Sequence, residues 1–265
     1  SDIELDSNLT LGLLGGTIRG KLSDIQSFDK AVVDADANLG IKVPDVDLTL
    51  KVGLSNTLAQ LKGNLDIDMK AFKGKLDAKG TFQMASKPTY VLTLNAQNFQ
   101  TNPMLTMASP TLKDVLVGTL NANLEVGGTG FSMTDVKENL SGRGKMELKE
   151  VELKGLNLGK AVQEQLKIIA IFGGSDVLSE NLESKINFIR SSVLIKEGKI
   201  YSPDGVLEAP GYGATLKGYA TFDKDINYEG EILIPAKKLP RSVASLADPK
   251  GNIGFPFTLT GRLPK

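Results

Sequence analysis

The chain contains no cysteine, no histidine and no tryptophan. Without cysteine it can form neither a disulfide framework nor a thiolate zinc site. Without histidine it lacks the commonest general base and metal ligand, which excludes Ser-His-Asp and Cys-His triads. These absences remove the most familiar hydrolytic mechanisms, so we expect a protein that is not an enzyme and has no cofactor or metal.

The chain also lacks any excess of charge. It has 31 basic and 31 acidic side chains, which gives a formal net charge of zero, and no basic tract. Because neutralisation of phosphates by Lys and Arg supplies much of the affinity of nucleic-acid-binding proteins, no nucleic-acid partner is expected. No apolar run approaches the roughly 18 residues of a membrane-spanning helix, the longest cluster being Ile168 to Phe172.

Alternation of apolar and polar residues is the dominant pattern of the chain. It is clearest in the segments Val46–Leu54, Gly63–Lys70, Thr119–Val126 and Ile226–Ile234. A period of two predicts strands with one buried and one wet face, which are typical of antiparallel sheets. Hairpin turns are expected at Lys196-Glu197-Gly198 and at Asp223-Lys224-Asp225, between Leu216–Phe222 and the following strand. We count roughly fourteen such strands.

A short signal, an apolar residue followed by any residue and then glycine, recurs where strands begin. It occurs at Ile18-Arg19-Gly20, Leu61-Lys62-Gly63, Leu140-Ser141-Gly142, Leu153-Lys154-Gly155, Leu216-Lys217-Gly218 and Leu259-Thr260-Gly261. Glycine inside a strand pattern often marks a bulge or bend. The spacing is irregular, which indicates a set of similar hairpins rather than a solenoid of fixed period.

Helices are few in this pattern. The strongest candidate spans about Leu158 to Phe172 and ends at Gly173-Gly174, with an apolar stripe of Val162, Leu166, Ile169 and Phe172. A shorter one is expected over Ser175–Leu182, and single turns near Pro103–Ala108 and Pro240–Leu246. The predicted fold class is mainly β: a long, curled antiparallel sheet that forms a groove, or alternatively a sandwich, with short helices capping it.

Two carboxylate pairs, Asp34 with Asp36 and Asp66 with Asp68, are spaced to point to the polar face of their strands. A glycosidase would need two such groups converging in a cleft. A solvated polar face is the simpler interpretation, and an all-β carbohydrate-active enzyme is kept as an alternative.

The apolar strand faces must be covered by a second layer or left as a trough. A trough would favour a long apolar guest, because each buried methylene contributes about 0.8 kcal/mol. The candidate lining residues are Leu65, Ile67, Met69, Leu120, Leu124, Val126, Met146, Leu148, Phe222, Ile232 and Ile234. The stripe Val162, Leu166, Ile169 and Phe172 would then cap one end of the trough or touch a membrane.

Three segments in the last two thirds of the chain resemble the AsmA family of bacterial envelope proteins. The first includes Val-Gly-Thr-Leu-Asn-Ala-Asn-Leu-Glu-Val-Gly-Gly-Thr-Gly at 117 to 130 and Leu-Ser-Gly-Arg-Gly-Lys-Met-Glu-Leu at 140 to 148, within 90 to 160. The others are Ser-Val-Leu-Ile-Lys-Glu-Gly-Lys-Ile at 192 to 200, continuing to 223, and Gly-Phe-Pro-Phe-Thr-Leu-Thr-Gly-Arg-Leu at 254 to 263. The family has Asp-Gly in a tight hairpin where this chain has Glu150-Val151. Residues 1 to 89 share only the strand style.

We expect a single elongated β-rich domain over 1–265, with N-terminal strands in 1–100 and an AsmA-like C-terminal module in 101–265, the module being what the resemblance implies. The resemblance further implies a periplasmic location, an inner-membrane anchor upstream of Ser1, and a curled sheet related to bridge-like lipid transfer proteins. The expected function is the binding or shielding of lipid acyl chains in phospholipid transport and outer-membrane homeostasis, with phospholipid or another acyl lipid and envelope assembly proteins as partners. The alternative from the residues alone is a structural or interaction protein with a closed, dry β-core and no ligand.

Overall fold

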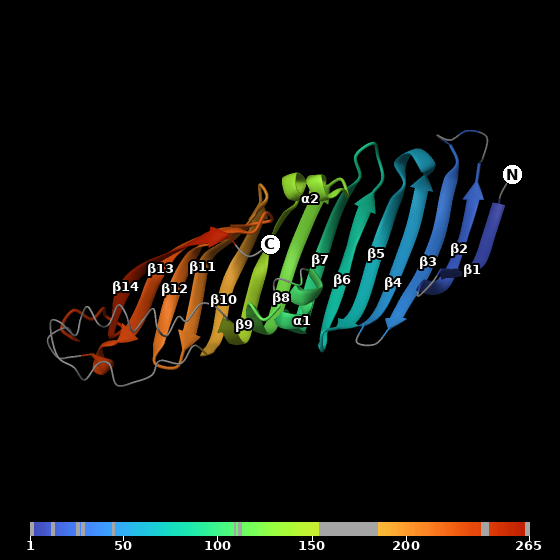
Figure 1. Ribbon diagram of the computed structural model, residues 1–265. Helices are drawn as coiled ribbons and strands as arrows, with labels where there is room; N and C mark the ends of the chain where they lie inside the picture. Colours follow the sequence, from blue (N-terminus) through green and yellow to red (C-terminus); the bar gives the residue numbers. More distant parts are fainter. Residues whose placement is uncertain are drawn as a thin grey trace. The chain divides into compact units, whose positions relative to one another are not determined.

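The computed structural model describes residues 3–11, 14–24, 27, 30–43, 46–108, 110, 113–153, 185–239 and 244–262. Fourteen antiparallel strands form one sheet, and each lies beside its neighbour in sequence, from β1 to β14 (Figure 1). The predicted mainly β class, with few helices, is therefore confirmed. The strands are β1 Ile3–Leu11, β2 Leu14–Ser23, β3 Val32–Val43, β4 Val46–Thr57, β5 Lys62–Ala71, β6 Gly74–Gln83, β7 Thr89–Gln100, β8 Leu116–Thr129, β9 Ser141–Leu153, β10 Lys185–Lys196, β11 Lys199–Ala209, β12 Tyr212–Thr221, β13 Asp225–Pro235 and β14 Asn252–Arg262.

Two tight turns show how the chain reverses between strands. Phe72 and Lys73, with φ of 52° and 59°, join β5 to β6, and Glu197 and Gly198, with φ of 53° and 69°, join β10 to β11. Positive φ at both central residues is the signature of a type I′ turn, whose twist matches that of the flanking strands. The hairpin predicted at Lys196-Glu197-Gly198 is confirmed.

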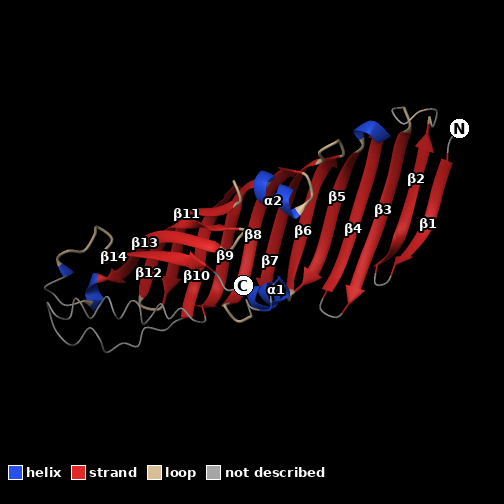
Figure 2. Cartoon of the chain, turned by 45° about the horizontal axis from the view of Figure 1, so that its top comes forward, coloured by secondary structure: helices blue, strands red, loops and turns tan. Residues whose placement is uncertain are grey.

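Helical segments among the described residues are short and join strands (Figure 2). They are α1 Thr101–Ala108, α2 Met133–Asn139, and the 3₁₀ turns η1 Leu58–Gln60 and η4 Ala236–Lys238. The turn predicted near Pro103–Ala108 is part of α1. Helix α2 was not predicted, although the Ser132 hydroxyl and the Asp135 carboxylate form a reciprocal capping box at its start. The helices predicted over Leu158–Phe172 and Ser175–Leu182 lie outside the described residues, as does most of Pro240–Leu246.

The chain divides into two compact units. Unit 1 comprises Ser1–Phe99, Asn121–Gly144 and Ile195–Gly198, and unit 2 comprises Gln100–Leu120, Lys145–Leu194 and Lys199–Lys265. Strands β1 to β7 belong to unit 1 apart from Gln100, and β11 to β14 belong to unit 2.

Unit 2 has a closed apolar core. It contains Val151, Ile186, Leu207, Ala209, Tyr212, Ala214, Ile232, Ile234, Leu239 and Ile253, all at most 9% exposed. A register shift in β11 between Ser202 and Gly205 places Asp204 against β10. The Asp204 carboxylate accepts hydrogen bonds from the backbone N–H of Ser192 at 2.7 Å and from the hydroxyls of Ser192 and Ser191. These bonds tie the β-bulge to the neighbouring strand.

Glycines show toward which side the sheet curls. In strands with neighbours on both sides, the glycines on the apolar face leave no room for a Cβ atom, which would come closer than 3.0 Å to another atom. These glycines are Gly16, Gly20, Gly63, Gly74, Gly80, Gly205, Gly218 and Gly230. On the polar face, at Gly40, Gly53, Gly213 and Gly254, the nearest atom would be 3.0 to 3.5 Å away. Side chains converge on the inner side of a bend, so each unit curls toward its apolar face.

Two sequence predictions need correction. Strand β12 ends at Thr221, so Phe222 lies in the turn before β13 rather than in a strand. The tight hairpin that the family resemblance implies at Glu150-Val151 is absent, because β9 continues through Leu153. Glu150 instead adopts a φ of 51° within the strand, and Val151 is fully buried in the core of unit 2.

Candidate functional site

The ladders of unit 1 align its apolar residues into rows that cross the strands. Paired residues in an antiparallel sheet point to the same face. One row therefore consists of Ser7, Ile18, Ala37, Val52, Leu65, Gly80 and Leu92 in β1 to β7. The next consists of Leu5, Gly20, Ala35, Leu54, Gly63, Phe82 and Tyr90.

On the other side of the first row lie Leu39, Leu50, Ile67, Ala78 and Leu94, followed by Leu48, Met69, Leu76 and Ala96. We call these four rows the apolar face of unit 1. It contains no charged side chain, and its polar side-chain atoms are the hydroxyls of Ser7 and Tyr90. Six inter-strand spacings of about 4.8 Å make each complete row roughly 29 Å long.

This face is only partly covered. Leu50, Ile67 and Leu94, which stand in one row, are each of intermediate exposure, and so are Val52 and Leu65 in the next row. Leu5 at the edge strand is 53% exposed. Ala78, between Ile67 and Leu94 in the same row, is buried, whereas in unit 2 large side chains such as Ile186, Leu207 and Ile232 are buried as well. The apolar face of unit 1 is therefore partly in contact with solvent.

Apart from Phe222, the predicted lining residues fall into four groups. Leu65, Ile67 and Met69 lie on the apolar face of unit 1, in β5. Leu124 and Val126 in β8 continue it. The residue after Val126, Gly127, faces Val91, which is on the polar side of β7, so Val126 and Leu124 point to the opposite, apolar side. Leu120, Met146 and Leu148 are partly buried, whereas Ile232 and Ile234 belong to the closed core of unit 2. Phe222, in a turn, is the exception.

The predicted capping stripe Val162, Leu166, Ile169 and Phe172 lies outside the described residues. It therefore stays a prediction, and the arrangement described here does not depend on it.

One polar atom in the core of unit 2 has no partner. Tyr212 is 5% exposed, and its hydroxyl, fully buried, makes no hydrogen bond. Burial in these apolar surroundings raises the pKa of the Tyr212 phenol, so it stays protonated at neutral pH.

The opposite face of unit 1 is polar and ion-paired. Asp66 and Asp68 lie on it, as predicted, and bind Lys79 at 3.3 Å and Lys75 at 3.5 Å. Lys75 also contacts Asp77 at 2.9 Å, and the hydrogen bond to Asp77 raises its pKa above the usual lysine value. The pairs of Lys79 with Asp66 and of Lys75 with Asp68 span β5 and β6, where opposite charges stabilise the ladder modestly.

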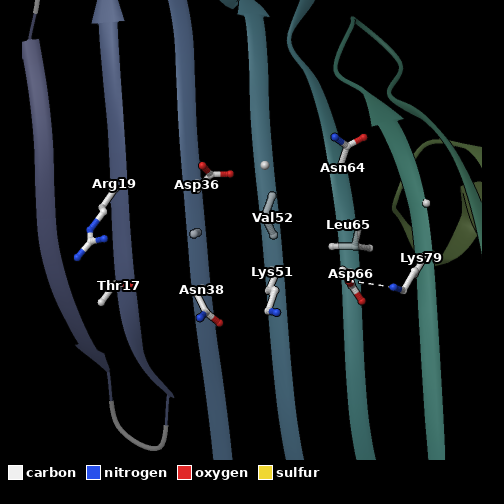
Figure 3. Close-up of a pocket in the computed structure, with 13 residues that line it drawn as sticks. Thr17, Arg19, Asp36, Asn38, Lys51, Val52, Asn64, Leu65, Asp66 and Lys79 are labelled. Carbon is white, nitrogen blue, oxygen red and sulfur yellow. Dashed lines mark ion pairs between the residues drawn. The ribbon is translucent and has the colours of Figure 1, made fainter.

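A shallow hollow of about 720 Å³ lies on this polar face (Figure 3). Its charged lining residues are Arg19, Asp36, Lys51, Asp66 and Lys79, which come from β2 to β6. Asp36 and Asp66 stand two strands apart, and Asp66 is neutralised by Lys79. The carboxylates thus alternate with cations on an open surface, which is the arrangement of a solvated outer face.

No protein-family model, curated protein or solved structure matches this chain. The AsmA resemblance therefore stands on the motifs alone. Within the described ranges, no helix combines the length and apolarity needed to cross a bilayer.

A cluster that sequence reasoning missed lies where β7 begins and β8 ends. The ring of Tyr90, at the end of an apolar row, stacks on Phe131 with centroids 5.5 Å apart. The backbone N–H of Gly130 donates to the carbonyl of Pro88 at 2.7 Å and holds the two loops together. Phe131 and Met133 are nevertheless 57% and 74% exposed. The exposed pair flanking Ser132 was the available signal in the sequence, but single apolar residues in loops are too common to carry a prediction.

Proposed function

We propose that this protein is a non-catalytic module that binds or shields lipid acyl chains on the apolar face of unit 1. The observation that carries the proposal is the uncharged, partly exposed set of rows that crosses β1 to β7 on the inner side of the curl. Leaving such a surface in water is unfavourable, and contiguous exposed apolar surfaces commonly mark binding sites.

The chemistry of the face favours a hydrocarbon chain over a polar ligand. The rows combine bulky residues such as Leu50 and Ile67 with small ones such as Ala37 and Gly80, which gives an uneven but continuous hydrocarbon floor. A methylene moved from water onto it contributes up to about 0.8 kcal/mol when fully covered. Six methylenes in half contact would thus contribute on the order of 2 to 3 kcal/mol. A headgroup would remain beyond the strand ends, since the face itself offers it no charge.

Placing this function in bacterial phospholipid transport and outer-membrane homeostasis is part of the same proposal. The support for a periplasmic location, an inner-membrane anchor and envelope assembly partners is the order of AsmA-like motifs in 90 to 263. The closed core of unit 2 favours a structural role for that unit, so the proposed lipid surface is confined to unit 1.

The test is a charge placed on either face of the same strand. Ile67 lies in the middle of an apolar row with Leu50 and Ala78 beside it, whereas Asn64, also in β5, points to the polar face and is exposed. Ile67→Glu should lower the affinity for a fluorescent fatty acid about tenfold or more, because a desolvated carboxylate opposes burial of the chain. Asn64→Glu introduces the same charge and should leave the affinity unchanged.

Native mass spectrometry after incubation with phosphatidylethanolamine provides the second measurement. The wild type and Asn64→Glu should retain lipid and Ile67→Glu should not, with circular dichroism confirming that all three are folded. If the wild type retains neither phospholipid nor fatty acid, or if both variants behave alike, the proposal is wrong and a protein without a ligand is the better description.

A further inference from the structure

We propose that the loop cluster formed by Met84, Phe131 and Met133 inserts into the surface of a phospholipid bilayer. We call this cluster the apolar tip of unit 1. Met84 belongs to the β6–β7 loop, Phe131 belongs to the segment between β8 and α2, and Met133 is the first residue of α2. Both connections lie at the same strand ends (Figure 1). The inference deepens the proposed function, on which it rests, by naming where acyl chains reach the apolar face.

The exposure of these side chains is the first observation. Phe131 is 57%, Met133 is 74% and Met84 is 38% exposed, and residues 83 to 87 of the neighbouring loop are all exposed. Exposing three large apolar side chains at adjoining loops to water is unfavourable in free energy.

The geometry holds Phe131 in its exposed position. Gly130 before it adopts a φ of +80°, which an L-residue rarely adopts, and a Cβ there would collide with Asp135. Ser132 after it is the N-cap of α2, and its hydroxyl accepts from the backbone N–H of Asp135 at 3.0 Å. The Asp135 carboxylate in turn accepts from Ser132, which lowers the pKa of that carboxyl. Phe131 is thus fixed between two constrained residues.

The tip continues the apolar face. Phe131 stacks on Tyr90, and Tyr90 is paired with Phe82 in an apolar row. A chain leaving a bilayer at Phe131 would reach the apolar face along these three rings, next to the Asp135 carboxylate that interacts with Tyr90. Tyrosine at such a junction suits the boundary of a membrane, where its ring is buried and its hydroxyl stays near water.

The size of the tip distinguishes a bilayer from a protein partner. A stable protein interface needs about 800 Å² from each side. Three partly exposed side chains offer on the order of 300 Å², since a whole aromatic side chain supplies only about 200 Å². Insertion into lipid needs no complementary surface, so this small area suffices for reversible docking.

The charge near the tip predicts which membranes it binds. Lys87 and Lys137 stand near Asp135 and Glu138, so neither sign prevails in this cluster. Docking should therefore be hydrophobic, with similar partitioning onto phosphatidylcholine vesicles with or without phosphatidylglycerol, and little dependence on salt.

The experiment is flotation of the full chain with such vesicles. Met133→Ser and Phe131→Ser should each lower the partition coefficient of the protein onto vesicles about tenfold. Met133 lies in α2, which contains no buried residue, so its replacement should not disturb packing. Leu246→Ser is the matched control, because Leu246 is 71% exposed but lies in unit 2, and it should leave partitioning unchanged.

Three outcomes would overturn the inference. The wild type does not float with vesicles; or Met133→Ser and Phe131→Ser float as the wild type does; or Phe131→Ser abolishes self-association seen by light scattering while vesicles bind nothing, which would identify a second copy of the chain as the partner. Fatty-acid binding in vesicle-free solution separates the two proposals. If fatty-acid binding persists while flotation fails, membrane insertion by the apolar tip is wrong and lipid binding on the apolar face is retained. If fatty-acid binding fails while flotation persists, lipid binding on the apolar face is wrong and membrane insertion by the tip is retained.

Discussion

Replacing Gly20 with alanine should destabilise the protein, whereas the same replacement at Gly40 should not. Both glycines lie in adjacent strands of unit 1, but Gly20 is on the apolar face and Gly40 on the polar one. A Cβ on Gly20 would lie 2.6 Å from the Cβ of Ala35 and 3.2 Å from its Cα. A Cβ on Gly40 would meet nothing closer than the Leu48 carbonyl oxygen at 3.5 Å.

The magnitudes follow from these distances. Forcing an extra methyl into a filled space costs about 1 to 3 kcal/mol, and here the neighbour is the short, rigid side chain of Ala35, which cannot rotate away. Alanine also restricts the unfolded chain more than glycine does, which stabilises by about 0.4 to 1 kcal/mol. The net expectation is a loss of about 1 to 2 kcal/mol for Gly20→Ala and a gain of up to about 1 kcal/mol for Gly40→Ala.

Urea unfolding followed by circular dichroism measures the difference. Hydrogen exchange of the β2 and β3 amides measures the local stability of these strands, since a sheet built from successive hairpins can open in parts. Equal stability of the two variants would show that the apolar face is not the inner side of the bend, and the concave surface proposed as the lipid site would lose its structural basis.

Three further predictions concern single polar groups. Tyr212→Phe should stabilise the protein by about 1 kcal/mol and raise its Tm, because it removes a buried hydroxyl without a partner; a lower Tm would reveal a partner for that hydroxyl. Asp204→Asn should cost about 1 kcal/mol at pH 7, an amount limited by solvent screening. Hydrogen bonds from Ser192 lower the pKa of Asp204 below 3.8 in the folded state. The stabilisation is therefore complete at pH values above the pKa of the unfolded chain, and it should disappear as the pH falls through the lowered pKa of the folded state. Urea unfolding at several pH values would follow this loss. Ser132→Ala should destabilise α2 by about 1 kcal/mol, seen as faster exchange of the Asp135 amide, with Thr134→Ala unchanged.

The strands could be predicted from the sequence because each has one apolar face and one polar face, so that apolar and polar residues alternate along the chain. The alternation at Gly63–Lys70 lies within β5, and that at Val46–Leu54 within β4, each predicted with boundaries short by one to three residues at an end. The apolar-x-Gly signal also has a physical meaning in the structure, since Gly20, Gly63 and Gly218 stand on the inner side of the bend, where a side chain does not fit.

What the sequence could not provide was the curvature and the tertiary exposure. The same Leu, Ile and Val pattern is partly exposed around Ile67 and buried around Ile232, because burial depends on what lies across the face and not on the strand itself. The positive φ at Glu150, within β9, has no signal in the sequence, since glutamate seldom adopts it. The short helix α2 depends on one capping box and contains no apolar stripe from which it could be inferred.

Because every strand pairs with its neighbours in sequence, the sheet can gain or lose whole hairpins during evolution. Removing or duplicating one hairpin within β1 to β7 would change the pairing only at that point. The later strands would keep their pairing with one another and the same residues facing inward. Gaining a single residue inside a strand is a different matter, since it would turn all following side chains in that strand to the other face. Relatives of this chain should therefore differ in length by pairs of strands, and their insertions should fall in the turns.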